Sequence, residues 1–465
     1  MPAELAPYLD LDACVEHLRA LIRIPSVNPP GTADGAAGRD TTGGETAAAR
    51  YCAEVLSGAE IECEVIELTE GRGSCFARLP ASGTATEPPL ILLSHIDVVP
   101  VDADSWSRDP FGAELVDGVI WGRGAVDMKD MVAMELAVML ALKRSGAELR
   151  RDVIFAAVAD EEAGGGQGAQ ALVVRRPELF TDAQGRPAAA ALNEVGGYSM
   201  TLGGRRFYAV QVAEKGIVWT RLRSTGTPGH GSMPHDDNAA IKLAAAVTAL
   251  AQDQAARPGR VVPTVESFLS ALGLGEVARL AVSDPRGAAA ELERTVADPV
   301  MRRSFDAMLR DTVTPNVLRA GKKVNVIPGV GEAEIDVRTL PGTDQQELLR
   351  HLQAVVGENA VVEPVVSLPA IEWPADAEIV TRMHEALRRA DPEATSVPMM
   401  ITPGTDAKAL AELGIPCYGF APLRLEPDVP FLSLFHGHDE RVPVSALAFG
   451  LPVLAEVVSG FVTRD

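Results

Sequence analysis

The chain has 465 residues, which is enough for two or three domains, and 47% of them are apolar, so a large core can form. Its 42 basic residues are outnumbered by 64 acidic ones, which gives a net charge of −22. Because a surface this acidic repels polyanions, we expect neither nucleic acid nor an anionic membrane as a partner.

The N-terminus and the cysteines indicate the cellular location of the protein. Residues 1–5 lack the basic and apolar regions of a signal peptide, and we expect no stretch of the roughly 18 apolar residues that a bilayer span needs. The five cysteines are odd in number and have no Cys-x-x-Cys spacing, which favours reduced, buried thiols over disulfides or a sulfur-ligated zinc. We therefore expect a cytoplasmic protein.

The first part of the chain alternates helix and strand patterns. Apolar residues have helical spacing at 11–23, before a Gly- and Pro-rich loop at 26–44. The same spacing recurs after the loop, at 45–56, 131–142 and about 168–175. Strand patterns lie between and after them, at 61–68, 90–93, 153–159 and 188–192. This alternation predicts an α/β fold with a mostly parallel central sheet sandwiched by helices.

The pattern changes after about residue 207. Apolar and polar residues alternate at 218–222 and 333–337, as in half-exposed strands, and helical or strand-like segments follow at 239–250, 348–356 and 360–366. Residues 253–315 look helical with breaks at prolines. We predict a smaller α+β domain, residues 208–367, inserted into a domain made of residues 1–207 and 368–465. An open sheet with exposed edges would suit a dimer interface.

Side chains that can bind metals follow the predicted buried strands. His95 follows the first apolar run, Glu161 and Glu162 the second, and Glu194 the third. Because ligands of α/β sheets gather beyond the carboxyl ends of the strands, these residues are expected at one site. Adjacent carboxylates at the end of a buried strand are costly unless a cation or a reaction needs them.

Other residues fit the same site. Asp97 could orient His95, Asp127 could bridge two ions, and either His436 or His438 could ligate. Each fragment also has a simpler interpretation, as a turn histidine, a helix-capping acid or a solvated loop. Together, two histidines and four carboxylates favour two divalent ions, Zn²⁺ first, with Co²⁺ or Mn²⁺ as alternatives, while one glutamate stays free to transfer a proton.

A nucleotide site is a poor alternative. The turn Gly122-Arg123-Gly124 lacks the third glycine of a dinucleotide fingerprint and the Lys-Ser/Thr ending of a phosphate loop. A nucleotide-dependent dehydrogenase is therefore disfavoured.

As a set, the motifs closely resemble one enzyme family. They are Ser94-His95-Ile96-Asp97, Gly122-Arg123-Gly124-Ala125-Val126-Asp127-Met128-Lys129, Asp160-Glu161-Glu162, Asn193-Glu194, Gly229-His230-Gly231-Ser232 and His436-Gly437-His438-Asp439-Glu440. The chain resembles the di-zinc metallopeptidases that include aminoacylases, carboxypeptidase S, glutamate carboxypeptidase, acetylornithine deacetylase and succinyl-diaminopimelate desuccinylase. The resemblance covers nearly the whole chain.

The resemblance implies a role for each motif residue of the larger domain. His95 and Glu194 would complete one metal site, Glu162 and His436 the other, and Asp127 would bridge them. His436 is preferred to His438 because the family ligand usually lies four residues before the glutamate of its motif. Glu161 would be the general acid/base and Asp97 would orient His95. The peptide bond after Asp127 would be cis.

The resemblance also implies that the inserted domain is a lid and dimerisation domain. His230 would then reach the active site of a partner subunit and stabilise an oxyanion. Arg338 would bind the substrate carboxylate, although it could instead pair with Glu334 or Asp336 on its own strand face. Further substrate contacts would come from Asn316, Gly404 and Thr405.

The expected function is hydrolysis of an amide bond, in a short peptide or an N-acyl amino acid, next to a free carboxylate. A hydroxide held by the two metals would attack the carbonyl, and Glu161 would pass its proton to the leaving nitrogen. The alternatives are a narrow biosynthetic deacylase and a non-catalytic metal- or amino-acid-binding relative, which would not need Glu161. The long 253–315 segment resembles the aminoacylase-like and carboxypeptidase S-like branches.

Overall fold

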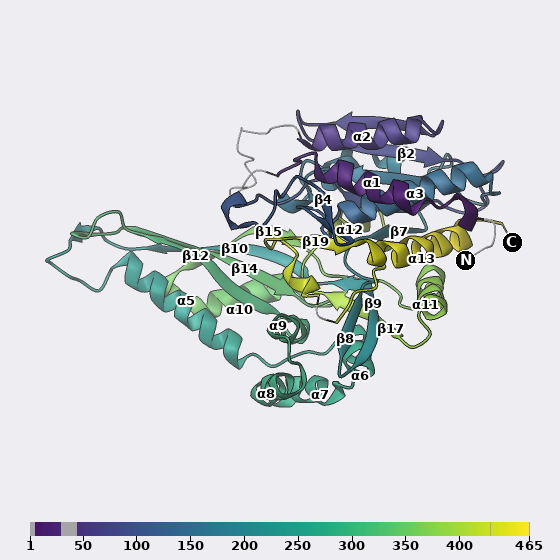
Figure 1. Ribbon diagram of the computed structural model, residues 1–465. Helices are drawn as coiled ribbons and strands as arrows, with labels where there is room; N and C mark the ends of the chain where they lie inside the picture. Colours follow the sequence, from purple (N-terminus) through teal and green to yellow (C-terminus); the bar gives the residue numbers. More distant parts are fainter. Residues whose placement is uncertain (1–4, 29–43, 428, 465) are drawn as a thin grey trace. The chain divides into compact units, whose positions relative to one another are not determined.

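The computed structural model describes residues 5–28, 44–427 and 429–464, so most of the predicted 26–44 loop (29–43) lies outside it (Figure 1). The chain forms two compact units. Unit 1 consists of Met1–Val212, Trp373–Met399 and Thr405–Asp465, and unit 2 of Ala213–Glu372 and Met400–Gly404. That unit 2 acts as a lid or dimerisation domain stays a prediction.

A ten-stranded sheet has most of its residues in unit 1. Its strand order is β1 (Glu62–Glu67), β2 (Gly73–Leu79), β6 (Val153–Val158), β3 (Leu90–His95), β7 (Ala190–Asn193), β18 (Cys417–Gly419), β9 (Arg205–Glu214) and β16 (Ile371–Glu372), and β8 (Ser199–Leu202) and β17 (Thr395–Ile401) also pair with β9. The four central strands β6, β3, β7 and β18 are parallel, which confirms the predicted α/β class. The flanking pairs β1–β2, β2–β6 and β8–β9 are antiparallel.

The central strands are buried on both faces. Every residue of β3 and β6 is buried, and neither strand shows the alternation of a half-exposed strand. Their parallel register pairs Leu90 with Val153 and His95 with Val158. The two strands therefore end side by side, and the residues that follow them emerge at the same edge of the sheet.

Helices cover this sheet. They are α1 (Leu11–Ile22), α2 (Gly44–Ser57), α3 (Lys129–Ser145), α4 (Ala169–Arg175), α11 (Glu378–Ala390), α12 (Ala407–Ala411) and α13 (Val444–Val462). The buried helix α3 packs on β3 and β6, and α1 and α13 pack against α3 (Figure 1). A small sheet of β4 (Glu114–Val116), β5 (Val119–Trp121) and β19 (Arg441–Pro443) joins the C-terminal part of the chain to the segment before Asp127.

Helix α13 corrects one expectation. It has 19 residues and is long and apolar enough to cross a membrane by length and composition, whereas the sequence had suggested no such segment. The apolar run is easily overlooked because Pro452, Glu456 and Ser459 interrupt it. Most of its apolar window (61%) is buried against other parts of the chain, as in a core helix, so it is weak evidence for a membrane span.

Unit 2 contains a four-stranded antiparallel sheet. Its order is β12 (Thr312–Ala320), β14 (Val330–Thr339), β10 (Gly216–Thr225) and β15 (Val361–Leu368). Buried residues of β10 and β14, such as Val218, Leu222 and Ile335, form a core with residues of α5 (Ala239–Ala256) and α10 (Gln345–Val356). Alternate residues of both strands are more exposed, as the predicted period of two requires. A short pair, β11 (Gly229–His230) with β13 (Val326–Ile327), lies in the same unit.

The proline-broken segment forms four helices of unit 2. They are α6 (Pro263–Ala271), α7 (Gly275–Ser283), α8 (Pro285–Thr295) and α9 (Pro299–Met308). Pro263, Pro285 and Pro299 each occupy the first helical position, where a missing N–H removes no helical hydrogen bond. These prolines therefore begin helices as well as ending the preceding segments.

We expect Leu136→Ala in α3 to destabilise unit 1 by about 2–5 kcal/mol, because a buried leucine lost from a packed core leaves a cavity. Urea unfolding followed by tryptophan fluorescence measures the effect. Val174→Ala is the control, since Val174 is 72% exposed, and it should change the free energy of unfolding by less than about 0.5 kcal/mol. Equal effects of the two changes would contradict the assigned core.

Candidate metal centre

The acidic and imidazole side chains of unit 1 meet where the central strands end. His95 is the last residue of β3, and Glu194 directly follows β7. Glu161 and Glu162 open a single turn of 3-10 helix, Glu161–Ala163, which is separated from the end of β6 by two residues. Parallel strands thus place residues that are 99 positions apart in the chain at one edge of the sheet.

Two sets of three side chains can each hold a metal ion among the described residues. One set is His95, Asp127 and Glu194, and the other is Asp127, Glu162 and His436, with the donor atoms of each set within 4.8 Å of one another. These sets have the same members as those that the resemblance implies, and Asp127 belongs to both. His438 and Glu161 belong to neither set.

Distances within each set are short. His95 Nε2 lies 3.1 Å from Asp127 Oδ1 and 3.6 Å from Glu194 Oε2. His436 Nε2 lies 3.3 Å from Asp127 Oδ2 and 3.1 Å from Glu162 Oε2. The two oxygens of Asp127 thus face different histidines, as a carboxylate bridging two ions must.

The two sets differ in exposure. The side chain of His95 is 1% exposed, whereas that of His436 is 59% exposed. The set that contains His436 is therefore the more open of the two to a molecule arriving from solvent.

Asp97 connects two strand ends. Its Oδ1 lies 3.6 Å from His95 Nδ1, and its two carboxylate oxygens accept the backbone N–H groups of Glu161 (3.2 Å) and Glu162 (3.0 Å). Asp97 therefore contacts both the His95 ring and the turn that carries the two glutamates.

The pKa values show how negative this pocket is. Burial lowers the pKa of His95, but Glu194, Asp127 and Asp97 outweigh it and hold the pKa well above the usual value. Hydrogen bonds to Asp127 and Glu162 raise the pKa of His436 to about 10. Both imidazoles are thus drawn towards their cationic form, so the pocket favours positive charge.

The carboxyl groups respond to the same crowding. Burial, followed by Glu194, raises the pKa of Glu161 well above its usual value, and burial raises that of Glu194 to about 7. Burial and Asp127 raise the pKa of Glu162. Divalent cations would relieve this repulsion, and a donor set of imidazole nitrogens and carboxylate oxygens suits them. The residues therefore fit two divalent ions.

Glu440 fixes the loop that carries Asp127. Its fully buried carboxylate accepts the backbone N–H groups of Gly124 (2.9 Å), Val126 (2.8 Å) and Asp127 (3.1 Å) and pairs with Arg123 at 2.6 Å. The Asp127–Met128 peptide bond is cis, as the resemblance implies. Since Glu440 lies four residues after His436, it also connects the two loops that supply Asp127 and His436.

Residues 91–460 match the peptidase family M20/M25/M40. The chain belongs to this family. It is 29% identical to aminoacylase-1 of Sus scrofa over 412 residues, which covers 85% of each protein. It is 30% identical to the N-fatty-acyl-amino acid synthase/hydrolase of Bos taurus over 377 residues, which covers 77% of this chain and 71% of that one.

Solved structures of the M20 family share the fold. A metallo-carboxypeptidase from Sulfolobus solfataricus superimposes with a TM-score of 0.67 at 19% identity, over 98% of this chain and 99% of the other. Family membership and the aminoacylase relatives make this chain a hydrolase that acts on amide or peptide bonds.

Four of the residues that the family resemblance implies for catalysis or substrate binding lie in unit 2. His230 is exposed, and its Nδ1 lies 2.8 Å from Ser232 Oγ. Arg338 forms a two-point ion pair with Asp336 (2.7 and 3.1 Å), as one of its two interpretations expected. Asn316 lies where the β12–β14 register shifts, between Pro315 and Val317. Gly404, the fourth, lies in the short Met400–Gly404 segment of this unit.

Thr405, by contrast, belongs to unit 1. Its hydroxyl accepts a hydrogen bond from Asn193 Nδ2 at 3.1 Å, and Asn193 precedes the predicted ligand Glu194. This contact ties Thr405 to the loop that carries Glu194. The oxyanion-stabilising role of His230 and the substrate contacts of Arg338, Asn316, Gly404 and Thr405 stay predictions.

Several residues that support the centre were not predicted from the sequence. Asn28, Glu45, Arg72 and Asp160 are buried polar residues next to Asp97, and Glu440 holds the Asp127 loop. Two of them belong to motifs already noted, Asp160 to the Glu161-Glu162 motif and Glu440 to the His436 motif. Asn28, Glu45 and Arg72 are isolated charged or amide residues in ordinary sequence surroundings.

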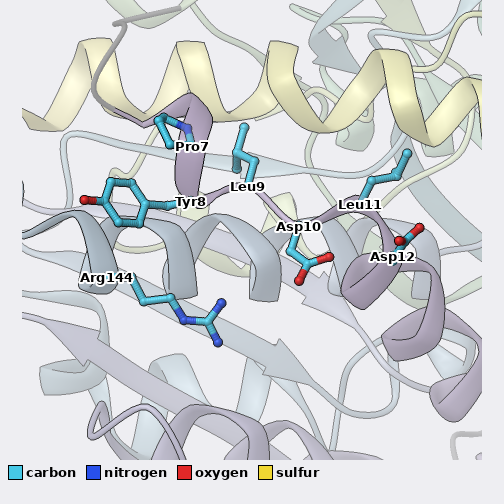
Figure 2. A pocket seen from close by; sticks show the side chains of 7 residues that line it. All are labelled: Pro7, Tyr8, Leu9, Asp10, Leu11, Asp12 and Arg144. Carbon is cyan, nitrogen blue, oxygen red and sulfur yellow. The ribbon is translucent and has the colours of Figure 1, made fainter.

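A separate hollow lies elsewhere in unit 1. Figure 2 shows this pocket of about 360 Å³, lined by Pro7, Tyr8, Leu9, Asp10, Leu11, Asp12 and Arg144. Asp10 caps helix α1 by accepting the N–H of Ala13 at 2.9 Å. None of the lining residues belongs to the two metal-binding sets.

Because Asp127 belongs to both sets, we expect Asp127→Ala to lower the bound metal from two ions per chain to less than one. Glu194→Ala should remove one ion, because it changes a single set. Inductively coupled plasma mass spectrometry on protein dialysed against trace Zn²⁺ measures both. Equal losses in the two variants would contradict a shared Asp127.

Proposed function

We propose that this M20 protein is a metal-dependent hydrolase that cleaves the amide bond of an N-acyl amino acid or a short peptide next to a free carboxylate. The observation that carries the proposal is the position of Glu161. It follows the same strand as Glu162 and is held by the same Asp97, yet it lies outside both metal-binding sets. A glutamate so placed is free to take up and release a proton.

The chain supplies ligands for two divalent ions, and we propose Zn²⁺, with Co²⁺ or Mn²⁺ as alternatives, because the donors are nitrogen and oxygen. When bound, the two ions would activate a water molecule and polarise the scissile carbonyl. Asp97 would keep the His95 ring and the Glu161 backbone in place. Glu161 would accept the proton of the water molecule and deliver it to the departing nitrogen.

Acyl amino acids are favoured as the substrate class by the curated relatives. The names of aminoacylase-1 and of the N-fatty-acyl-amino acid synthase/hydrolase, which are 29% and 30% identical to this chain, both refer to acyl groups and amino acids. The alternatives of a narrow biosynthetic deacylase and of a non-catalytic relative are less well supported. A protein that only binds metal or amino acids would not need a free glutamate such as Glu161.

We further propose a homodimer formed through unit 2, in which His230 of one subunit would serve the active site of the other. Strands β12 and β15 are the two edges of the unit 2 sheet, and edge strands offer unpaired backbone groups to a second copy. A cytoplasmic location is proposed from the free thiols of Cys14, Cys52, Cys63 and Cys75.

We expect Glu161→Gln to lower kcat by about 10²–10⁴-fold while the bound metal stays near the wild-type amount, because glutamine cannot transfer the proton. Hydrolysis of N-acetyl-methionine, followed by release of the free amine, measures kcat, and metal analysis measures the ions. Glu178→Gln, a change of a glutamate side chain that is 60% exposed, is the control. Wild-type kcat in the Glu161 variant would disprove its assigned role.

We expect the enzyme to hydrolyse N-acetyl-methionine about 10–100-fold faster, in kcat/KM, than its methyl amide, since a charge-assisted hydrogen bond contributes about 1.5–3 kcal/mol. Arg338→Met should reduce this preference, if Arg338 exchanges Asp336 for the substrate carboxylate. Arg319→Met is the matched control, because Arg319 pairs with Glu334 in the same sheet. An unchanged preference in Arg338→Met would reject Arg338 as the carboxylate-binding residue.

A further inference from the structure

A cluster of buried polar side chains lies next to Asp97. It consists of Asn28, Glu45, Arg72 and Asp160, which we call the Arg72 cluster, and each residue is between 1% and 3% exposed. They come from four separate parts of unit 1: the segment after α1, the start of α2, the residue before β2 and the end of β6. None of them belongs to a metal-binding set, and no step of the proposed reaction uses them.

Arg72 lies at the middle of the cluster. Its Nη1 donates to both carboxylate oxygens of Glu45 at 2.8 Å and lies 3.4 Å from Asp160 Oδ1. Its Nη2 donates to Asn28 Oδ1 at 3.1 Å. One guanidinium thus connects three side chains that are distant in the sequence.

Asn28 carries this contact to Asp97. Because its Oδ1 accepts from Arg72, its Nδ2 must face the other way, where it donates to Asp97 Oδ2 at 2.8 Å. The backbone N–H of Asn28 also donates to Val98 O at 2.8 Å, which fixes the segment beside Asp97. Arg72 therefore sets which way the amide points, and the amide in turn holds one oxygen of Asp97.

Glu45 carries a second contact, to the turn before Glu161. Its Oε1 accepts the backbone N–H of Asp160 at 3.0 Å. Asp160 has a left-handed backbone with φ of 72°, and its Oδ2 accepts the N–H of Gln167 at 2.8 Å. Glu45 and Asp160 together hold the chain in the conformation that leads into Glu161 and Glu162.

Charge explains why an arginine is needed here. Glu45 and Asp160 are buried carboxyl groups that pair with one guanidinium, and the buried carboxyl group of Asp97 connects to it through Asn28. Removing a buried cation while its acidic partners remain leaves charge that the surroundings cannot solvate. Arg72 thus both neutralises part of this charge and, through its fork of donors, fixes the geometry.

We propose that Arg72 and Asn28 are positioning residues of the metal centre. Through Asn28 and Glu45, Arg72 holds Asp97 and Asp160, and these hold the His95 ring and the turn that carries Glu161 and Glu162. The proposal deepens the proposed function and rests on its metal centre. A cluster that served only the stability of unit 1 would affect folding without changing the affinity for metal.

The test uses three variants of the full chain and one matched control. Arg72→Met removes the charge and the fork, Arg72→Lys keeps the charge without the fork, and Asn28→Ala removes the amide while keeping every charge. The control is Arg151→Met, since Arg151 is 2% exposed, lies in unit 1 and pairs with Glu87, with no contact to a metal-binding residue.

We expect Arg72→Met and Asn28→Ala to weaken Zn²⁺ binding by about 10–100-fold, the usual effect of removing a residue that orients metal ligands. Arg72→Lys should fall between wild type and Arg72→Met. Zn²⁺ titration in competition with a fluorescent chelator measures the affinity, and urea unfolding measures stability. In hydrolysis of N-acetyl-methionine, kcat should fall more than KM rises, since Glu161 is displaced as well.

Asn28→Ala keeps the proposal testable if Arg72→Met does not fold. Zn²⁺ affinity within twofold of wild type in Asn28→Ala would overturn the proposal, as would an equal loss of affinity in Arg151→Met. A wild-type protein that binds Zn²⁺ but hydrolyses no acyl amino acid or peptide would refute the proposed function alone, because the titration still decides the role of the Arg72 cluster. A wild-type protein without Zn²⁺ affinity would refute both.

Discussion

The structure of unit 1 depends on the repulsion among acidic groups that are held together away from water. Asp97, Asp127, Glu161, Glu162 and Glu194 meet at one sheet edge, where burial and neighbouring carboxylates raise the pKa values of the three glutamates, while hydrogen bonds to the histidines outweigh burial and lower the pKa values of the two aspartates. Metal ions would offset part of this repulsion. The protein offsets the negative charge of the neighbouring carboxylates with backbone N–H groups that donate to Asp97 and Glu440 and with the buried cations Arg72 and Arg123.

These supports are arranged around the ligands in two places. Asp97 and the Arg72 cluster hold the ends of β3 and β6, and Glu440 with Arg123 holds the loop of Asp127. The turn that carries Glu161 and Glu162 and the loop that carries Asp127 are thus each fixed by a carboxylate that accepts backbone N–H groups. The arrangement keeps the ligands in place without using their own oxygens, which stay free for cations.

Much of this site follows from the sequence because its parts obey local rules. The apolar runs before His95, Glu161 and Glu194 predict buried parallel strands, and such strands bring their ends together. The Arg72 cluster could not be predicted, because its contacts join residues 27 to 132 positions apart and nothing local marks which charged side chains become buried. The antiparallel pairing of β2 with β6 and the packing of helix α13 on α3 depended in the same way on partners distant in the chain.

The contact between Asp127 and Glu440 has a consequence for how the protein is made. Their 313-residue separation means that, at about 5–20 residues per second, a ribosome needs roughly 15–60 s to supply the second partner after the first. All of unit 2 lies between them in the sequence and is therefore made in that interval. The inserted unit can therefore fold during translation, while the unit that surrounds it gains the His436 side chain and the Glu440 support of Asp127 only after the inserted unit has been made.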